Sequence, residues 1–370
     1  MDHMFEHTPS LSEDNSIPLL RERVESARAR EDYPGLSYAL GALGRALLKE
    51  HSTLEGLTCF DEAVKIAQQL DDPEAEARHL GNQGIALAHI GNFSQAHRSF
   101  RKAYTIAQRI GHTPLIFDAL VQIADLEMER ENPEGALASL EDALQIAEQK
   151  GNLPPQLKAH LMLGRIYWTQ QEFDLAAGHY QSALHLATTL EDGGAQVECL
   201  HQLGAMAKSR GETAQAVSYF RQALDVPLEL KHPQRDLALV AQLGDALLDS
   251  GDFSQALDNY EKALQLARTL SDRQAEARLL GSLSIVQAEL GDREQSITLT
   301  DRAVEMARES GQIQLLGEQL LLQALAYYDH GQMQAALSAC IEALAIFEKI
   351  EASSLLEKAM DLLEEIQSGH

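Results

Sequence analysis

Small residues recur every forty residues along this chain. When the sequence is shifted by forty residues and laid against itself, the same residue types fall in register from about residue 34 to residue 350. One column contains alanine at all eight of its positions, which are Ala63, Ala103, Ala143, Ala183, Ala223, Ala263, Ala303 and Ala343. A fixed period of this length is typical of repeat architectures, in which each repeat is one supersecondary unit that packs against its neighbours.

A second column is rich in glycine, and a third is rich in bulky residues. The glycines are Gly44, Gly84, Gly164, Gly204 and Gly244, and the bulky residues are Phe60, Phe100, Leu140, Tyr180, Phe220 and Tyr260. Glycine inside a helix costs about 0.5–1 kcal/mol relative to alanine, so its repetition needs a packing reason. We expect Gly84 to face Ala96 on the next helix, so that the two backbones approach closely. Ala103 is then expected to make room for the following repeat.

Composition and turn signals predict helices throughout the chain. The sequence is rich in Ala, Leu, Gln and Glu and has no long β-branched runs, a balance that favours helix over strand. Gly91 divides the second repeat in two, and Pro73 stands at the first turn of a predicted helix, where its missing N–H has no partner to lose. Each repeat is therefore expected to contain two helices of about seventeen residues joined by a short turn. Pro227 replaces an alanine of the repeat, and because an interior proline costs a helix about 3 kcal/mol, we expect a break or bend in the fifth repeat.

The charge balance limits the kinds of partner. The chain carries 56 acidic and 30 basic residues and a net charge of −26. It therefore repels phosphate backbones and anionic lipid, and we expect neither a nucleic-acid nor a membrane partner. The first residues lack the basic start and apolar core of a signal peptide, and no stretch approaches the ~18 apolar residues of a membrane span. These features predict a cytoplasmic protein.

No pattern typical of catalysis or of cofactor binding stands out. The 14 His residues show no metal-ligand spacing, and the sequence contains no Gly-rich phosphate loop and no spacing typical of a catalytic nucleophile. We therefore expect no enzyme activity, no metal and no cofactor. Cys59, Cys199 and Cys340 are far apart in the sequence and are expected to pack in or near the core.

These columns resemble the tetratricopeptide repeat (TPR), whose signature places a large apolar residue, Leu-Gly, a large residue, Ala, an aromatic residue and Ala at fixed intervals. The second repeat matches this signature with Leu80, Gly84, Leu87, Ala96, Phe100 and Ala103. The forty-residue length is similar to the longer variant of LGN-type polarity adaptors, kinesin light chains and many bacterial regulators. The resemblance implies an all-α fold, a right-handed α-α superhelix (TPR solenoid) of about eight repeats plus capping half-repeats.

The repeats also define the expected domain organisation. We expect a single superhelical domain over residues 16–368, preceded by a disordered tail over residues 1–15. Capping helices are predicted at residues 17–31 and 355–367. The eight repeats are predicted near residues 34–72, 73–112, 113–152, 153–192, 193–232, 233–272, 273–312 and 313–351.

The resemblance further implies that the first helices of the repeats line a concave groove that holds the partner. One column of this groove holds carboxamides at a place where LGN-like proteins use Asn to hold the backbone of an extended ligand, and a carboxamide suits this because it both donates and accepts. Basic residues prevail in the first four repeats and acidic residues in the last four, so the groove is expected to be bipolar. A second interpretation, that these side chains are merely solvated helix formers, stays open. The residues predicted to bind the partner are Arg45, Lys49, Arg78, Asn82, Gln122, Lys158, Arg165, Trp168, Gln202, Gln242, Asp245 and Asp249.

These features are compatible with three classes of function. The leading prediction is a non-catalytic adaptor that binds a protein or an extended peptide and is a monomer or a weak homodimer. The alternative is a ligand- or peptide-sensing regulatory module similar to those of bacterial transcription activators, and an enzyme is the weakest of the three. The Lys and Asn set with which chaperone-binding TPRs hold a C-terminal carboxylate is not reproduced at Ala42, Arg45 and Asn82, which disfavours chaperone tails. The identity of the partner, a further domain and occupation of the groove by residues 1–15 stay open.

Overall fold

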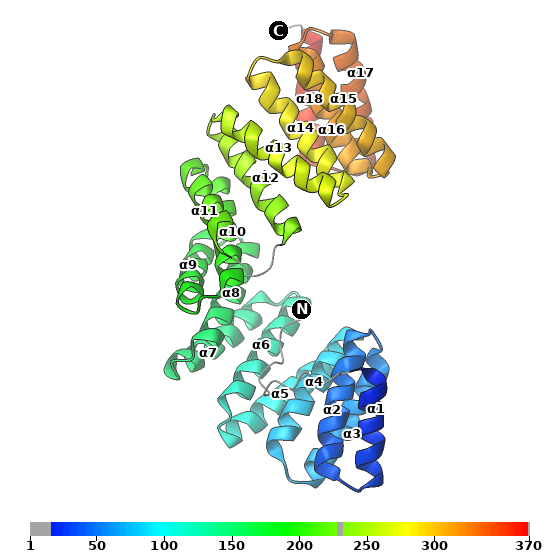
Figure 1. Ribbon diagram of the computed structural model, residues 1–370, viewed down its shortest axis with the longest axis vertical. Coiled ribbons are helices and arrows are strands. Elements are labelled where there is room, and N and C mark those ends of the chain that lie inside the picture. Colours follow the sequence, from blue (N-terminus) through cyan, green and yellow to red (C-terminus); the bar gives the residue numbers. More distant parts are fainter. Residues whose placement is uncertain (1–15, 228–231, 369–370) are drawn as a thin grey trace. The chain divides into compact units, whose positions relative to one another are not determined.

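The computed structural model describes residues 16–227 and 232–368. Within these ranges the chain forms eighteen α-helices and no strand (Figure 1). The helices are α1 (Ile17–Ala29), α2 (Tyr33–Lys49), α3 (Thr53–Gln69), α4 (Pro73–His89), α5 (Phe93–Ile110), α6 (Thr113–Glu129), α7 (Pro133–Gln149), α8 (Leu153–Thr169), α9 (Phe173–Thr189), α10 (Gly193–Ser209), α11 (Thr213–Asp225), α12 (Pro233–Asp249), α13 (Phe253–Thr269), α14 (Arg273–Glu289), α15 (Arg293–Ser310), α16 (Ile313–Asp329), α17 (Met333–Lys349) and α18 (Ser353–Ser368). The tail expected over residues 1–15 lies outside the described residues.

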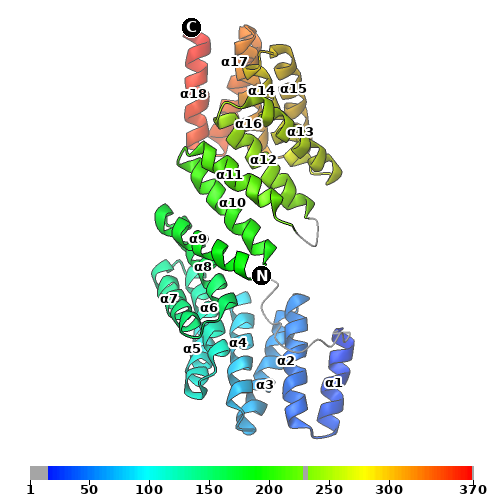
Figure 2. The same ribbon diagram turned by 60° about the vertical axis from the view of Figure 1, so that its left-hand side comes forward.

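The chain divides into two compact units within α9. The first unit ends at Ser182 and contains α1 to α8 and the first part of α9, and the second begins at Ala183 and contains the remaining helices. Within each unit, helices that follow one another in the sequence pack together in antiparallel pairs (Figure 2). The predicted all-α succession of eight helix pairs with a half-repeat at each end is confirmed within the described residues.

Local sequence signals start and stop the helices. The side chains of Asp32, Asp72 and Asn92 each cap a helix by accepting a hydrogen bond from the backbone amide three residues later. The residue before such a cap has a left-handed backbone, with φ of 51° at Asp71 and 76° at Gly91. A Cβ at Gly91 would meet nothing within 4 Å, so the backbone conformation rather than packing favours glycine there.

The expected break in the fifth repeat is confirmed. The helix α11 has 13 residues, whereas the second helices of the other repeats have 17 or 18. It ends at Asp225, and Val226 has an extended backbone with φ −65° and ψ 119°. A residue that precedes proline is pushed out of the helical region, so Pro227 accounts for this end.

Each glycine of the glycine column makes room for an aromatic ring on the second helix of its repeat. A Cβ on Gly84 would lie 2.5 Å from Cε1 of Phe100, and a Cβ on Gly204 would lie 2.7 Å from Cε1 of Phe220. The same contact joins Gly44 to Phe60, Gly164 to Tyr180 and Gly244 to Tyr260. The three repeats without this glycine also lack the ring, with the pairs Ala124 and Leu140, Ser284 and Thr300, and Ala324 and Cys340. The close backbone approach expected at this point is seen in the first repeat, where a Cβ on Gly56, at the position of Ala96, would lie 3.0 Å from the carbonyl oxygen of Gly44. At Gly84 the atoms nearest to an added Cβ are those of the Phe100 ring.

The first helices of neighbouring repeats contact one another directly. In the first unit α4 contacts α2 and α6, and in the second unit α14 contacts α12 and α16. A Cβ on Gly41 of α2 would lie 2.6 Å from Cε1 of His79 on α4, and Gly281 of α14 faces Gln319 of α16 in the same register. We call the surface formed by α2, α4, α6 and α8 the first-helix surface of the first unit, and that formed by α10, α12, α14 and α16 the first-helix surface of the second unit.

Candidate functional site

In the first unit, the structure brings together charged candidates of α6 and α8. Burial raises the pKa of the Asp125 carboxyl group, and the neighbouring cations of Arg165 and Lys158 oppose this shift. Burial likewise lowers the pKa of Lys158, against the effect of Asp118 and Asp125. Gln122 is half-buried on the same helix as the two aspartates. This part of the first-helix surface therefore carries mixed charge rather than purely basic charge.

A second group of candidates lies on α2 and α4. Asn82 is 1 % exposed, and its Nδ2 has no hydrogen-bond partner among the described residues. Arg45 is half-buried, and its pKa is lowered chiefly by burial and further by Arg78. Nη2 of Arg78 pairs with Oε1 of Glu74 at 2.5 Å, whereas no described residue forms an ion pair with Arg45. Lys49 is exposed at the end of α2.

Part of the Trp168 side chain packs against another residue of its own repeat. Its ring meets that of Phe173 edge-on, with centroids 5.0 Å apart. The side chain is half-buried. Only the exposed part of the Trp168 indole is therefore available for contact with a partner.

In the second unit, Asp245 and Asp249 already have a basic partner. Nζ of Lys208 on α10 lies 3.0 Å from Oδ2 of Asp245 and 3.8 Å from Oδ2 of Asp249. The hydroxyl group of Tyr260 also donates to Oδ1 of Asp245 over 2.7 Å. The predicted groove column did not include Lys208, although this residue shares the repeat position of Trp168. The acidic excess expected in the last four repeats is reduced by this ion pair.

The carboxamides of the second unit are half-buried. Gln242 on α12 lies beside His201 on α10, and burial lowers the pKa of His201. Within the described residues, neither Oε1 of Gln242 nor Nε2 of His201 has a hydrogen-bond partner. Gln202 is half-buried on α10.

A pair of histidines occupies the interior of the fourth repeat. Nδ1 of His160 lies 2.9 Å from Nδ1 of His179, whose ring stacks on Tyr167 at 5.4 Å and 10°. The other seven repeats have a buried aliphatic residue at the position of His160, namely Leu40, Leu80, Leu120, Leu200, Val240, Leu280 and Leu320. Burial lowers the pKa of both imidazoles, and Glu141 opposes this for His179. The fourth repeat therefore has a neutral pair of histidines, His160 and His179, where the other repeats have an aliphatic core residue at the position of His160.

Replacing this pair with the residues of the third repeat is expected to stabilise the protein. The double variant His160→Leu with His179→Ser recreates Leu120 and Ser139. It buries an additional aliphatic side chain, which contributes about 1 kcal/mol. The gain increases below pH 6.5, because histidines with lowered pKa values favour the unfolded state once it is protonated. Thermal unfolding at neutral and acidic pH measures both effects, and a lower midpoint than the wild type at neutral pH would contradict the expectation.

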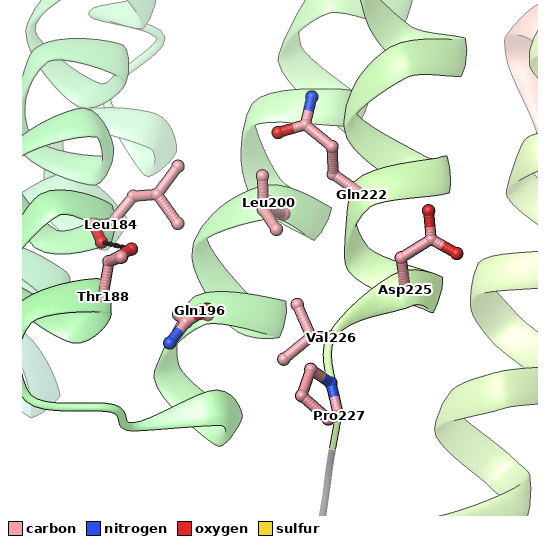
Figure 3. A pocket seen from close by; sticks show the side chains of 8 residues that line it. All are labelled: Leu184, Thr188, Gln196, Leu200, Gln222, Asp225, Val226 and Pro227. Carbon is pink, nitrogen blue, oxygen red and sulfur yellow. Dashed lines mark hydrogen bonds between the residues drawn. The ribbon is translucent and has the colours of Figure 1, made fainter.

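A pocket of about 370 Å³ lies in the second unit where α11 ends early. Figure 3 shows its lining, which consists of Leu184 and Thr188 on α9, Gln196 and Leu200 on α10, and Gln222, Asp225, Val226 and Pro227 at the end of α11. In the repeats before and after, Ala187 and Ala267 occupy the position of Pro227 and are fully buried. Pro227 itself is exposed, so the early end of α11 leaves this space unfilled. The sequence indicated the break but not the pocket, and none of the predicted binding residues lines it.

Two further observations apply to the part of the chain that the structure describes. No three side chains of His, Cys, Asp or Glu are grouped so that they could hold a metal ion. No helix combines the length and the apolar character needed to cross a membrane.

The family of the chain follows from its match to family models. A model described as tetratricopeptide repeat matches residues 35–109, 115–189 and 236–309, and a second model with the same description matches residues 197–226. The chain belongs to the tetratricopeptide repeat family. The TPR solenoid expected from the sequence is therefore confirmed. Proteins with TPR repeats are protein-interaction scaffolds that bind proteins or peptides, and they are typically not enzymes.

Solved structures share this TPR fold. The apo form of RapI has a TM-score of 0.66 and 13 % identity, covering 95 % of this chain and 99 % of RapI. A signal transduction ATPase with numerous domains (STAND) and a TPR sensor, from Pyrococcus horikoshii, has a TM-score of 0.65 and 13 % identity over 95 % of this chain and 55 % of its own. The TPR chain thus spans about half the length of that protein. The apo form of the quorum sensor NprR from B. thuringiensis has a TM-score of 0.55 and 12 % identity over 90 % of this chain and 95 % of NprR. At these sequence identities the similarity to solved structures shows the fold alone. No curated protein sequence matches the chain significantly.

Proposed function

We propose that this TPR protein is a non-catalytic cytoplasmic scaffold that binds an extended peptide or a protein segment along its first-helix surfaces. The observation that carries the proposal is that polar atoms on these surfaces lack partners. Nδ2 of Asn82 in the first unit and Oε1 of Gln242 in the second are buried without a hydrogen bond among the described residues. Buried polar groups are nearly always paired, so a ligand that supplies the missing partners is favoured.

The chemistry of these side chains suits a peptide. A carboxamide offers both a donor and an acceptor, and this matches a peptide unit. The mixed charges of Asp125, Lys158 and Arg165 suit a segment with both acidic and basic side chains. The net charge of −26 favours a protein partner over nucleic acid or an anionic membrane. We also propose that the protein acts as a monomer or a weak homodimer.

A selection from short random peptides tests this proposal. Each selected peptide is measured against two variants of the first-helix surfaces, Lys158→Glu with Arg165→Glu in the first unit and Gln202→Lys with Gln242→Lys in the second. We expect one of the two to weaken the binding of each peptide at least about 10-fold, because it removes or reverses contacts at the bound segment. The matched control is Arg98→Glu with Lys102→Glu, which changes two exposed residues of the second-helix layer on α5 and should leave binding unchanged. Peptides that respond to neither first-helix variant would remove these surfaces from consideration.

A ligand-sensing regulatory module is the second candidate. It is favoured by the likeness to a STAND protein with a TPR sensor and to the quorum sensor NprR, each of which covers at least 90 % of this chain. A ligand that binds the folded state raises the unfolding temperature by mass action. A short peptide that raises this temperature and also changes the affinity for a partner protein would favour the sensor. A peptide that competes with the partner at the same surface would favour the scaffold.

A further inference from the structure

A polar cluster between α2 and α4 interrupts an otherwise apolar contact between first helices. It consists of Ser37 and Arg45 on α2 and His79 and Asn82 on α4. The position of Ser37 is occupied in the other repeats by Ala77, Phe117, Leu157, Val197, Leu237, Ala277 and Gly317. The position of His79 is occupied by Ala39, Ala119, Ala159, Cys199, Leu239, Leu279 and Gln319. Apart from Gln319, the equivalent positions are held by apolar residues or glycine, so the cluster is a local departure from the pattern of the repeats.

Gly41 brings the members of this cluster together. A Cβ on Gly41 would lie 2.6 Å from Cε1 and 3.0 Å from Nδ1 of His79, and 3.7 Å from Nη1 of Arg45. The imidazole and the guanidinium therefore lie over the same glycine. Because α2 and α4 run in the same direction (Figure 1), Asn82, about one turn after His79, is level with Arg45, about one turn after Gly41.

The cluster presents donors for which the described residues provide no acceptor. Oγ of Ser37 lies 3.0 Å from Nε2 of His79, and when the hydroxyl donates, the ring proton is on Nδ1. Nδ1 of His79 and Nδ2 of Asn82 have no hydrogen-bond partner among the described residues, and the two side chains are 4 % and 1 % exposed. Arg45 adds the donors of a half-buried guanidinium that no described acidic residue pairs. With the ring proton of His79 on Nδ1, the cluster has three donor groups without an acceptor, and such a set favours an anion.

The acidic residues around this cluster are already engaged. The side chain of Asp72 accepts a hydrogen bond from the amide of Ala75, and Glu74 pairs with Arg78. Burial, followed by the charges of Arg45 and Arg78, lowers the pKa of His79 to about 4. His79 is therefore neutral at physiological pH, and in the tautomer that accepts a hydrogen bond from Ser37 its Nδ1–H group is a donor. Arg45 is then the positive charge of the cluster.

We propose that Arg45, His79 and Asn82 form a subsite for the carboxylate of an acidic side chain in the bound peptide. The inference rests on the proposed function and names one chemical feature of the partner. A carboxylate accepts two parallel bonds from a guanidinium and has lone pairs left for the imidazole and the carboxamide. A single carboxylate matches the single positive charge of Arg45. A polyanion would be repelled by a chain with a net charge of −26.

The test uses the full chain and the selected peptides, synthesised with acetylated and amidated ends so that side chains carry their only carboxylates. Each Asp or Glu of a peptide is replaced in turn by Asn or Gln. We expect one replacement to weaken binding to the wild type at least about 10-fold and to have no effect on the variant Arg45→Gln, because the two changes remove the same ion pair. The matched control Arg98→Gln on α5 should retain the response of the wild type. Peptides that bind without any acidic residue, or that respond equally in both proteins, would overturn the inference.

A stability measurement separates this role from a structural one. A half-buried cation without an acidic partner costs stability in the free protein, so Arg45→Gln is expected not to lower the unfolding temperature. A lowered temperature together with unchanged peptide preference would assign Arg45 to the fold and overturn the subsite. Peptides that respond to the first-helix variants but not to the loss of their carboxylates would overturn the subsite and leave the scaffold standing. Peptides that ignore the first-helix variants altogether would overturn both.

Discussion

A single methyl group at Gly84 is expected to lower the free energy of unfolding by about 1–3 kcal/mol, the usual cost of overpacking a core. The added Cβ would lie 2.5 Å from Cε1 and 2.7 Å from Cδ1 of Phe100. The ring is 1 % exposed, so it cannot move away without displacing other core side chains. Chemical denaturation of Gly84→Ala and of the wild type measures the difference.

Two further variants make this result specific. Gly81→Ala changes a glycine of the same helix whose Cβ would meet nothing within 4 Å, and we expect it to stabilise by about 0.5–1 kcal/mol. Gly84→Ala combined with Phe100→Leu recreates the pair Ala124 and Leu140 of the third repeat. This double variant is expected to be less destabilised than the sum of its single changes. Equal stabilities of Gly84→Ala and Gly81→Ala would mean that the ring is not the reason for the glycine.

Acid is expected to destabilise the protein through His79. The pKa of His79 is lowered from 6.5 to about 4, chiefly by burial and then by the charges of Arg45 and Arg78, while Asp72 opposes the shift. Between these two pH values the unfolded state binds a proton that the folded state does not. The stability linked to His79 is therefore fully present above pH 6.5 and is lost as the pH falls towards 4, by about 3 kcal/mol over the whole window.

The variant His79→Gln isolates this effect, because glutamine does not titrate and occupies the same position in the eighth repeat as Gln319. Free energies of unfolding at several pH values between 7 and 4 are compared for the two proteins. We expect the wild type to lose more stability than the variant. The other histidines with lowered pKa values, His97, His160, His179 and His201, titrate in both proteins and cancel in the comparison. The same pH dependence in both would show that the imidazole of His79 is hydrated in the folded state.

The candidate site could be predicted only in part. The repeat places Asn82 and Gln122 at the same position of their first helices, yet Asn82 is 1 % exposed whereas Gln122 is half-buried. The difference arises from the helices on either side, which a position within one helix does not reveal. Lys208 was overlooked for a similar reason, since its partners Asp245 and Asp249 belong to the next repeat.

The sequence by itself determined the forty-residue repeat, the two helices of each repeat, the turns between them and the end of α11 before Pro227. These features depend on residues close together in the chain, through helix propensity, capping side chains and the steric demand of proline. Only the tertiary structure decided that the ring of Phe100 packs against Gly84 and that Lys208 pairs with Asp245. The same is true of the packing of the His79 and Arg45 side chains against Gly41. These contacts join different helices, and their register is set by how whole side chains interlock when the helices pack.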